Sequence, residues 1–426
     1  MYKKLLSFAK KQTSLNIAIN TFGNYLNVAF TAVSALILVR VMGPVDYGIL
    51  SVLLGIVYVL ANVLDFGATA TIYSYLPPLL VKSREDVYRF VKTVFFYQST
   101  LSCASLIILI IAFPYLDRIF FKTGAGPVEF YLTSISTLLL LWQNFNLNIH
   151  FAARKFVIAN IYLNIANVVK MIALVVLIWT NLVTVGSIIA VFGIVGPLAL
   201  FTCVMWEKRR VVTSVLTARV RRSDFRPRYT ITYFIATQFY NMALRMDLFL
   251  LSFFGLRAEV GYYALAQKII LTIVSTIISI TQVLSPHFAN VRNKKQTLHE
   301  FKNGLLYFLI PTALFVVLFF IPDGLFFLFF THKFAPAATI THVLALPFIL
   351  FTLAHLPMLF LLYTVRKPIY ILAGNIVYFV GVTVGSYLLI PHFGVYGPPY
   401  AIVASLLATI AIFGIGSRVE YKKLPK

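Results

Sequence analysis

Charged residues, acidic residues and cysteines are all scarce in this sequence. Charged residues make up 12% of the 426-residue chain, and only 13 residues are Asp or Glu. A soluble domain of ordinary composition has about one quarter of its residues charged, so one could be present only as a short insertion. The two cysteines, Cys103 and Cys203, lie far apart inside apolar segments, which suits buried thiols better than a disulfide or a metal site.

Apolar residues, in contrast, dominate the chain: 60% are hydrophobic and 15% aromatic. No water-soluble packing can bury that much apolar surface, so the bilayer has to be the solvent. Segments of about the 20 residues that cross a bilayer lie near 15–39, 47–76, 88–113, 128–150, 156–178, 184–206, 229–253, 260–288, 304–321, 338–363, 368–390 and 396–416. The sequence therefore predicts an all-α membrane protein with twelve transmembrane helices.

The basic residues are distributed unevenly over the loops. The net charge is +23, but Lys and Arg form short clusters between apolar runs rather than the continuous basic face of a nucleic-acid-binding protein. One set of loops and both termini hold 28 of the 36 basic residues, whereas the opposite loops hold five. Because basic residues near span ends are retained in the cytoplasm, both termini are predicted to be cytoplasmic.

The two halves of the chain repeat each other at an offset of 212 to 213 residues. GPVDYG at 43–48 and GLRAEVG at 255–261 each join the first two spans of a half, and an Arg-Lys pair opens the fifth span of each half, at 154–155 and 366–367. An even number of spans per half implies parallel repeats related by an axis along the membrane normal. We expect an N-terminal lobe at 1–206, a basic cytoplasmic linker at 207–228 and a C-terminal lobe at 229–426.

Polar residues recur three or four positions apart in the first two spans of each half, so each set shares one helix face. The members expected to line a hydrated cavity are Asn20, Asn24, Asn27, Asn62, Gln238, Asn241, Thr272 and Gln282. A polar side chain is costly against lipid, so a stripe has to face other helices or water. Hydrogen bonding between helices is the simpler explanation for a single asparagine, whereas the four stripes together favour a cavity.

Five charged residues lie inside predicted spans: the cations Lys170, Arg245 and Lys268, and the anions Asp65 and Asp247. Placing one such charged side chain at mid-membrane costs about 2.5–3.5 kcal/mol, so a structural or functional role is expected for each. Asp65 could pair with Lys268 or Arg245, whereas Asp247, two residues from Arg245, lies on nearly the opposite helix face and is not its obvious partner. The excess of cations favours a cavity suited to phosphate, with Lys as a point charge and Arg as a bidentate fork.

The GPVDYG turn, LDFG at 64–67 and DLFLLSFFGLRAEVGYYALAQKI at 247–269 resemble the polysaccharide-transporter branch of the multidrug, oligosaccharidyl-lipid and polysaccharide (MOP) exporter superfamily, the Wzx-type flippases. The resemblance covers essentially the whole chain. It implies two six-helix lobes in a V-shaped, MATE-like arrangement that alternately expose a central cationic cavity to the cytoplasm and the periplasm. The chain lacks the two additional helices of peptidoglycan-precursor flippases, which counts against that substrate.

Members of this family carry undecaprenyl-pyrophosphate-linked oligosaccharides outward across the bacterial inner membrane for O-antigen, capsule or related polymers. Carried onto this chain, substrate binding falls on Arg245 and Lys268, and less directly on Lys170. Asp65 and Asp247 are the candidates for ion coupling or charge pairing. The resemblance implies no cofactor, with a proton or sodium gradient as the candidate energy source. The expected partners are the lipid-linked substrate and membrane lipids, with a polysaccharide polymerase or chain-length protein as a further candidate.

Two alternatives share the polytopic composition. A polysaccharide polymerase or ligase would present a large external loop with catalytic residues, whereas the longest external loop here, about 114–127, is small and carries no acid–base constellation. A drug or small-molecule exporter is the other alternative. The facilitator type would have a Gly-rich Asp-Arg signature in the loop that here reads VKSREDVYRF, and the signature is missing. The sequence thus favours a transporter without enzymatic activity.

Overall fold

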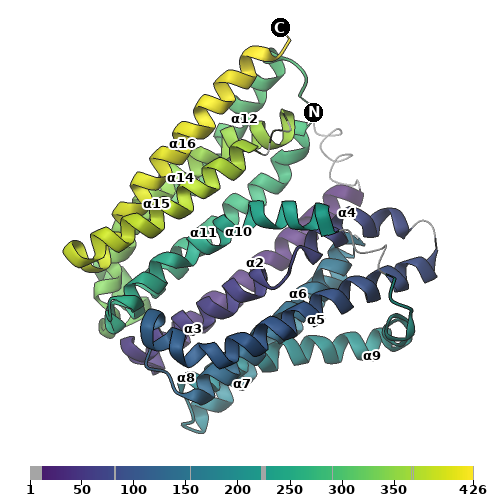
Figure 1. Cartoon of the computed structure of the whole chain (residues 1–426). Coiled ribbons are helices and arrows are strands. Elements are labelled where there is room, and N and C mark those ends of the chain that lie inside the picture. The colour runs from purple at the N-terminus through teal and green to yellow at the C-terminus, as the bar shows by residue number, and fades with distance from the viewer. Residues whose placement is uncertain are drawn as a thin grey trace. The chain divides into compact units, whose positions relative to one another are not determined.

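The computed structural model of the chain describes residues 12–80, 83–153, 155–221, 227–289, 291–365, 367 and 369–425. These residues are almost entirely helical and include no strand (Figure 1). Eight helical stretches within these ranges are long and apolar enough to cross a membrane. One of them, Ile369–Lys423, consists of two helices joined by a short turn at Gly394–Tyr396.

In the described part of the first half, every predicted span corresponds to helix. The elements are α2 (Gln12–Val41), α3 and α4 (Pro44–Val63 and Ala68–Leu79), α5 (Arg84–Leu116), α6 (Pro127–Ala152), α7 (Phe156–Trp179), and α8 and α9 (Val185–Ala190 and Gly196–Thr217). A π-helical turn, η1 (Asp117–Phe121), follows α5, and another, η2 (Val191–Val195), lies between α8 and α9. The predicted linker from residue 207 onward is helical as far as Thr217, with a kink at Lys208.

The described part of the second half repeats this plan. Its long helices are α10 (Pro227–Phe253), α11 (Arg257–Ala289), α12 (Lys294–Phe319), α14 (Pro336–Leu359), α15 (Ile369–Phe393) and α16 (Gly397–Lys423). The short α13 (Asp323–Phe330) precedes α14, and it was not expected from the sequence. α15 and α16 lie side by side as a long hairpin (Figure 1). The prediction of an all-α membrane protein with twelve helical spans is confirmed.

The second span differs from its predicted form because it is broken in the middle. The sequence predicts one helix over 47–76, whereas α3 ends at Val63 and α4 begins at Ala68. Between them Phe66 has φ 46° and Gly67 has φ 79°, a left-handed conformation that glycine adopts without steric cost. The LDFG segment therefore marks a turn within the membrane span, and its exposed backbone groups need partners other than the helix itself.

Contacts divide the chain into two compact units. Unit 1 comprises Met1–Ala35, Leu53–Leu116 and Ala125–Ile235, and unit 2 comprises Leu36–Val52, Asp117–Gly124 and Ala236–Lys426. In unit 1, α4, α5 and α6 pack around Ile72, Val94 and Phe145, while α6, α7 and α9 pack around Tyr162 and Leu200. Unit 2 contains α10 from Ala236 onward and α11 to α16, together with two segments from the first half of the sequence.

The two glycine-containing segments of the repeat, 43–48 and 255–261, meet inside unit 2; we call them the glycine turns. A Cβ on Gly48 would lie 2.5 Å from the carbonyl oxygen of Arg257, and a Cβ on Gly261 would lie 2.0 Å from that of Pro44. Gly48 corresponds to Gly261, and Pro44 to Arg257, at the offset of 213 residues. The contact is thus reciprocal, as in an isologous interface. Phe334 covers it with its ring edge-on to Tyr47.

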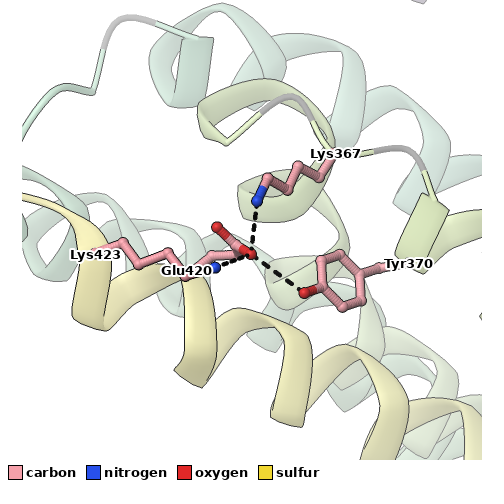
Figure 2. A network of polar contacts seen from close by, with 4 residues as sticks. All are labelled: Lys367, Tyr370, Glu420 and Lys423. Carbon is pink, nitrogen blue, oxygen red and sulfur yellow. Dashed lines mark hydrogen bonds and ion pairs between the residues drawn. The ribbon is translucent and has the colours of Figure 1, made fainter.

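Near the C-terminal end of α16, Glu420 binds residues at and just before the start of α15 (Figure 2). Its carboxylate accepts hydrogen bonds from Lys367 and Lys423, both at 2.9 Å, and from the Tyr370 hydroxyl at 3.2 Å. The Glu420 side chain is 3% exposed, whereas the two lysines are about half exposed. In unit 1 Glu207, at the offset of 213, is bound by Tyr162 and Lys208, so the repeat extends to the ends of the last helices.

We expect Glu420→Gln to lower the free energy of unfolding by about 1 kcal/mol, because the amide loses two charge-assisted hydrogen bonds whose lysine partners are partly screened by water. Thermal unfolding of the purified protein in detergent measures the change. Glu85→Gln is the control, since Glu85 is exposed. Equal melting temperatures for Glu420→Gln and the control would show that the cluster contributes no stability.

Candidate charged sites in the two units

The carboxylate of Asp247 is at the centre of a buried polar cluster in unit 2. It accepts hydrogen bonds from the Tyr263 hydroxyl at 2.6 Å, from the backbone N–H of Leu248 at 2.7 Å and from the Gln267 amide at 2.9 and 3.1 Å. Asp247 and Gln267 are 3% and 4% exposed. A buried carboxylate requires such donors to offset its lost hydration, so this side chain is fixed in one position.

Gln267 of α11 connects this carboxylate to Arg245. Arg245 Nη1 donates to Gln267 Oε1 at 2.9 Å, while Gln267 Nε2 donates to Asp247. Arg245 and Asp247 lie about 200° apart around α10, which is why no pairing between them was expected. The structure links them through a third residue from the next helix. Both ends of the Gln267 amide are occupied, which determines its orientation and holds the Arg245 guanidinium.

Lys268 follows Gln267 directly, about 100° further around α11, and it is half-buried. Thr272, a predicted cavity residue, donates its hydroxyl to the Lys268 carbonyl oxygen at 2.9 Å. Gln238 and Asn241 are half-buried on α10. Within the predicted spans 229–253 and 260–288, Arg245 and Lys268 are thus two cations against one carboxylate, Asp247, an excess of positive charge that suits an anionic ligand.

Asp65 occupies the break between α3 and α4 in unit 1. Its carboxylate accepts hydrogen bonds from the Thr69 backbone N–H at 3.1 Å, the Thr69 hydroxyl at 3.0 Å and the Gln98 amide at 2.9 Å. Asn148 of α6 donates to Thr69 Oγ1 at 2.8 Å and accepts from the Tyr73 hydroxyl at 3.3 Å. Asp65 thus satisfies the start of α4, as N-terminal caps do, and ties α4 to α5 and α6.

Lys170 of α7 lies in unit 1 against the π-helical turn η2. Its ammonium is 5.7 Å from the centre of the Phe192 ring, within the range of a cation–π contact. A Cβ on Gly196 would lie 2.7 Å from Lys170 Cδ, so that glycine makes room for the aliphatic part of the side chain. The side chain of Lys170 therefore packs against η2 and the start of α9. Its role in substrate binding stays a prediction.

Several predicted cavity residues of unit 1 form ordinary helix contacts. Asn27 Oδ1 accepts from Asn167 Nδ2 at 2.8 Å, which joins α2 to α7. Asn62 donates to the carbonyl oxygen of Tyr58 in its own helix at 2.8 Å. The side chains of Asn20, Asn24 and Gln282 lie outside the described part of the structure. Whether the four stripes line a cavity stays a prediction.

The five intramembrane charges were predicted from the sequence, but their uncharged partners Gln98, Tyr263 and Gln267 were not, nor was Asn148, which binds Thr69 beside Asp65. Three of these had a signal. Gln98 is the single amide in α5, a span without a polar stripe, and Tyr263 and Gln267 lie in the stretch 247–269 that carries the family resemblance. Within the described ranges no group of three or more His, Cys, Asp or Glu side chains gathers as a metal site would require.

The fold is similar to those of solved transporters. The chain aligns with a structure of the lipid II flippase MurJ in an inward closed conformation with TM-score 0.72 and 15% identity, over 95% of this chain and 88% of that one. It aligns with the MATE multidrug transporter DinF-BH with TM-score 0.64 and 16% identity, over 94% of both chains. An outward-facing multidrug resistance MATE transporter of the MOP superfamily gives TM-score 0.64 and 13% identity over 96% of both chains.

These likenesses first define the class: a multi-pass, all-helical membrane protein with the fold shared by MurJ and the MATE transporters of the MOP superfamily. The family described as "Polysaccharide biosynthesis protein" matches residues 15–292, more than half of the sequence. The chain therefore belongs to the polysaccharide biosynthesis protein family, as the resemblance to Wzx-type flippases predicts. No curated protein shows significant sequence similarity to it.

Proposed function

We propose that this protein is a flippase that moves undecaprenyl-pyrophosphate-linked oligosaccharide repeat units from the cytoplasmic to the periplasmic leaflet by alternating access, for surface polysaccharide such as O-antigen or capsule. The observation that supports this function best is the Arg245–Gln267–Asp247 network, in which Gln267 directly precedes Lys268 along α11. A pyrophosphate needs positive charge inside the membrane, and the cluster supplies an arginine whose direction is set by a buried carboxylate.

The proposal assigns separate roles to the parts of the substrate. The pyrophosphate binds Arg245 and Lys268, which lowers the cost of moving its charge through a medium of low dielectric constant. The sugars occupy the hydrated cavity that the polar stripes predict, and the lipid tail stays in the bilayer. Asp65 and Asp247 are engaged by hydrogen-bond donors of their own units, so an ion-coupling role would have to compete with those contacts.

The proposed location is the bacterial inner membrane with both termini in the cytoplasm. The support is the accumulation of 28 of the 36 basic residues on one set of loops and at the termini, where the positive-inside rule places them in the cytoplasm. A polysaccharide polymerase or chain-length protein that receives the flipped unit is the proposed partner.

We expect the double variant Arg245→Ala/Lys268→Ala to abolish export in a flippase-null strain, because both cations of the proposed pyrophosphate site are removed. Surface polysaccharide and a direct flipping assay in vesicles measure the effect. Each single variant is expected to lose roughly tenfold or more, as for one charge-assisted contact. Lys302→Ala, which removes an exposed cation, is the control.

Full export by a well-expressed Arg245→Ala/Lys268→Ala protein would contradict the cationic-site assignment. Export of a cationic drug without any movement of lipid-linked sugar would favour a multidrug exporter instead. Polymerisation or ligation of the glycan by purified protein would favour the enzyme alternative.

A further inference from the structure

A cavity of about 750 Å³ lies wholly within unit 1, separate from the Asp65 and Asp247 clusters. It is formed by the end of α4, the first turns of α5, the last turns of α6, and α9. Seventeen of its 22 lining residues are apolar or aromatic, with Leu76, Val91, Phe145 and Val212 contributed by these four helices. Its volume is in the range of small-molecule and cofactor pockets, about 300–1,000 Å³.

Apart from Tyr88, the ionisable residues that line this cavity are all basic. They are Arg84, Lys155 and Lys208, together with His150, and no carboxylate belongs to the described lining. Lys208 is bound to Glu207, whereas Arg84 and Lys155 form no ion pair with any other described residue. Both are exposed and lie at or next to the loops where the basic residues gather. One end of an otherwise apolar cavity is therefore positively charged.

A comparison of the two halves shows that this charge is not a requirement of the repeat. Lys367 is the counterpart of Lys155 at the offset of 212, and it is bound to Glu420 at 2.9 Å (Figure 2). Glu207 is the counterpart of Glu420, but it is bound by Tyr162 and Lys208. In unit 1 the lysine thus lines the cavity mouth, while in unit 2 its equivalent is bound to a carboxylate.

The depth of the cavity fits one leaflet of a bilayer. Along α5 the lining extends from Arg84 to Phe95, and along α6 from Ala153 back to Trp142. Eleven residues of α-helix rise about 16 Å, which is about half of a hydrocarbon core of about 30 Å. An acyl chain of a phospholipid matches that depth, whereas a 55-carbon isoprenoid chain is far longer than one leaflet.

We infer that this cavity binds an anionic phospholipid of the leaflet on the basic side, with its phosphate at Arg84 and Lys155 and an acyl chain between α5, α6 and α9. Basic pockets between transmembrane helices on the cytoplasmic side are a known way to hold anionic headgroups. The site is separate from the substrate site proposed above and does not depend on that assignment.

The test compares lipids on the full-length purified protein. Phosphatidylglycerol is expected to raise the melting temperature, while phosphatidylcholine with the same acyl chains and glycerol phosphate without chains leave it unchanged. Arg84→Gln/Lys155→Gln is expected to bind phosphatidylglycerol at least roughly tenfold more weakly, because two charges at the mouth are lost. Arg292→Gln/Lys295→Gln, which removes two exposed cations of unit 2, is the matched control and keeps wild-type affinity.

A second variant separates binding in the cavity from adsorption to a basic surface. Val212→Trp leaves the cations in place but fills part of the cavity, and it is expected to prevent phosphatidylglycerol from co-purifying. Three results would overturn the inference: equal stabilisation by phosphatidylglycerol and phosphatidylcholine, unchanged binding by both Arg84→Gln/Lys155→Gln and Val212→Trp, or displacement of phosphatidylglycerol by a smaller amount of undecaprenyl phosphate. The last would assign the cavity to an isoprenoid lipid.

Discussion

Gly261→Ala is expected to reduce export of surface polysaccharide to roughly a tenth of the wild-type level or less, because the added methyl group cannot fit. A Cβ at this position would lie 2.0 Å from the carbonyl oxygen of Pro44, a backbone atom that cannot rotate away. The two glycine turns would have to separate, at a cost of about 1–3 kcal/mol or more for overpacking. If the proposed flippase alternates between states, this packed state would be lost from the cycle.

The separation of the turns can be measured directly. Val260 is 1% exposed, so a Val260→Cys reporter in a Cys103→Ser/Cys203→Ser background should react slowly with a membrane-impermeant thiol reagent. Adding Gly261→Ala should increase that rate. Gly43→Ala is the matched control within the same motif, because a Cβ there meets no atom within 4 Å, and it should change neither labelling nor export.

A milder variant keeps the test informative if Gly261→Ala is poorly produced. A Cβ on Gly48 would lie 2.5 Å from the Arg257 carbonyl oxygen, so Gly48→Ala should show the same effects to a smaller extent. Wild-type export and slow labelling in both glycine variants would mean that the turns do not need to pack this closely for function.

The positions of the helices could be predicted from the sequence because length and apolar composition are local properties. The break at Phe66 and Gly67 was missed, since LDFG is apolar enough to continue a span and its left-handed backbone is stabilised by Asp65 and residues from other helices. The glycine turns were found as a repeat, but a repeat does not show that its two copies touch. That contact depends on packing between segments more than 200 residues apart.

The candidate site was predicted in part for the same reason. Charges inside membrane spans are conspicuous, so Arg245, Lys268 and Asp247 were identified from the sequence alone. Gln267 was missed because the family resemblance of 247–269 assigns no role to this residue, whose importance comes from what lies on each side of it. Which side chains of α10 and α11 face each other depends on how the two helices are rotated about their axes. Helical periodicity within one segment does not predict that rotation.

Asp247→Asn is expected to lower export roughly tenfold through Arg245, because the hydrogen bonds described above connect the two residues through Gln267. The Asp247 carboxylate accepts from Gln267 Nε2, and Gln267 Oε1 accepts from Arg245. An asparagine amide would place an N–H group toward a donor. If Gln267 turned over to accept from it, its own N–H groups would face the guanidinium, and Arg245 would lose its support.

A compensating change distinguishes this positioning role from a simple loss of stability. In Asp247→Asn/Gln267→Glu the glutamate accepts from both the asparagine and Arg245, so one carboxylate remains and Arg245 keeps its acceptor. We expect this double variant to export within about threefold of wild type, since mutations in one network are not additive. Gln267→Glu alone, which brings two carboxylates together, should be defective.

The matched control is Asp65→Asn, which changes the buried carboxylate of unit 1 in the same way. Its partners are Thr69 and Gln98, so Gln267→Glu should give it no benefit. Export by Asp247→Asn/Gln267→Glu that is no better than by Asp247→Asn alone would contradict the positioning role. Transport would then require the Asp247 carboxylate itself and not the orientation of Arg245. In that case Asp247 would be a stronger candidate for ion coupling than Asp65.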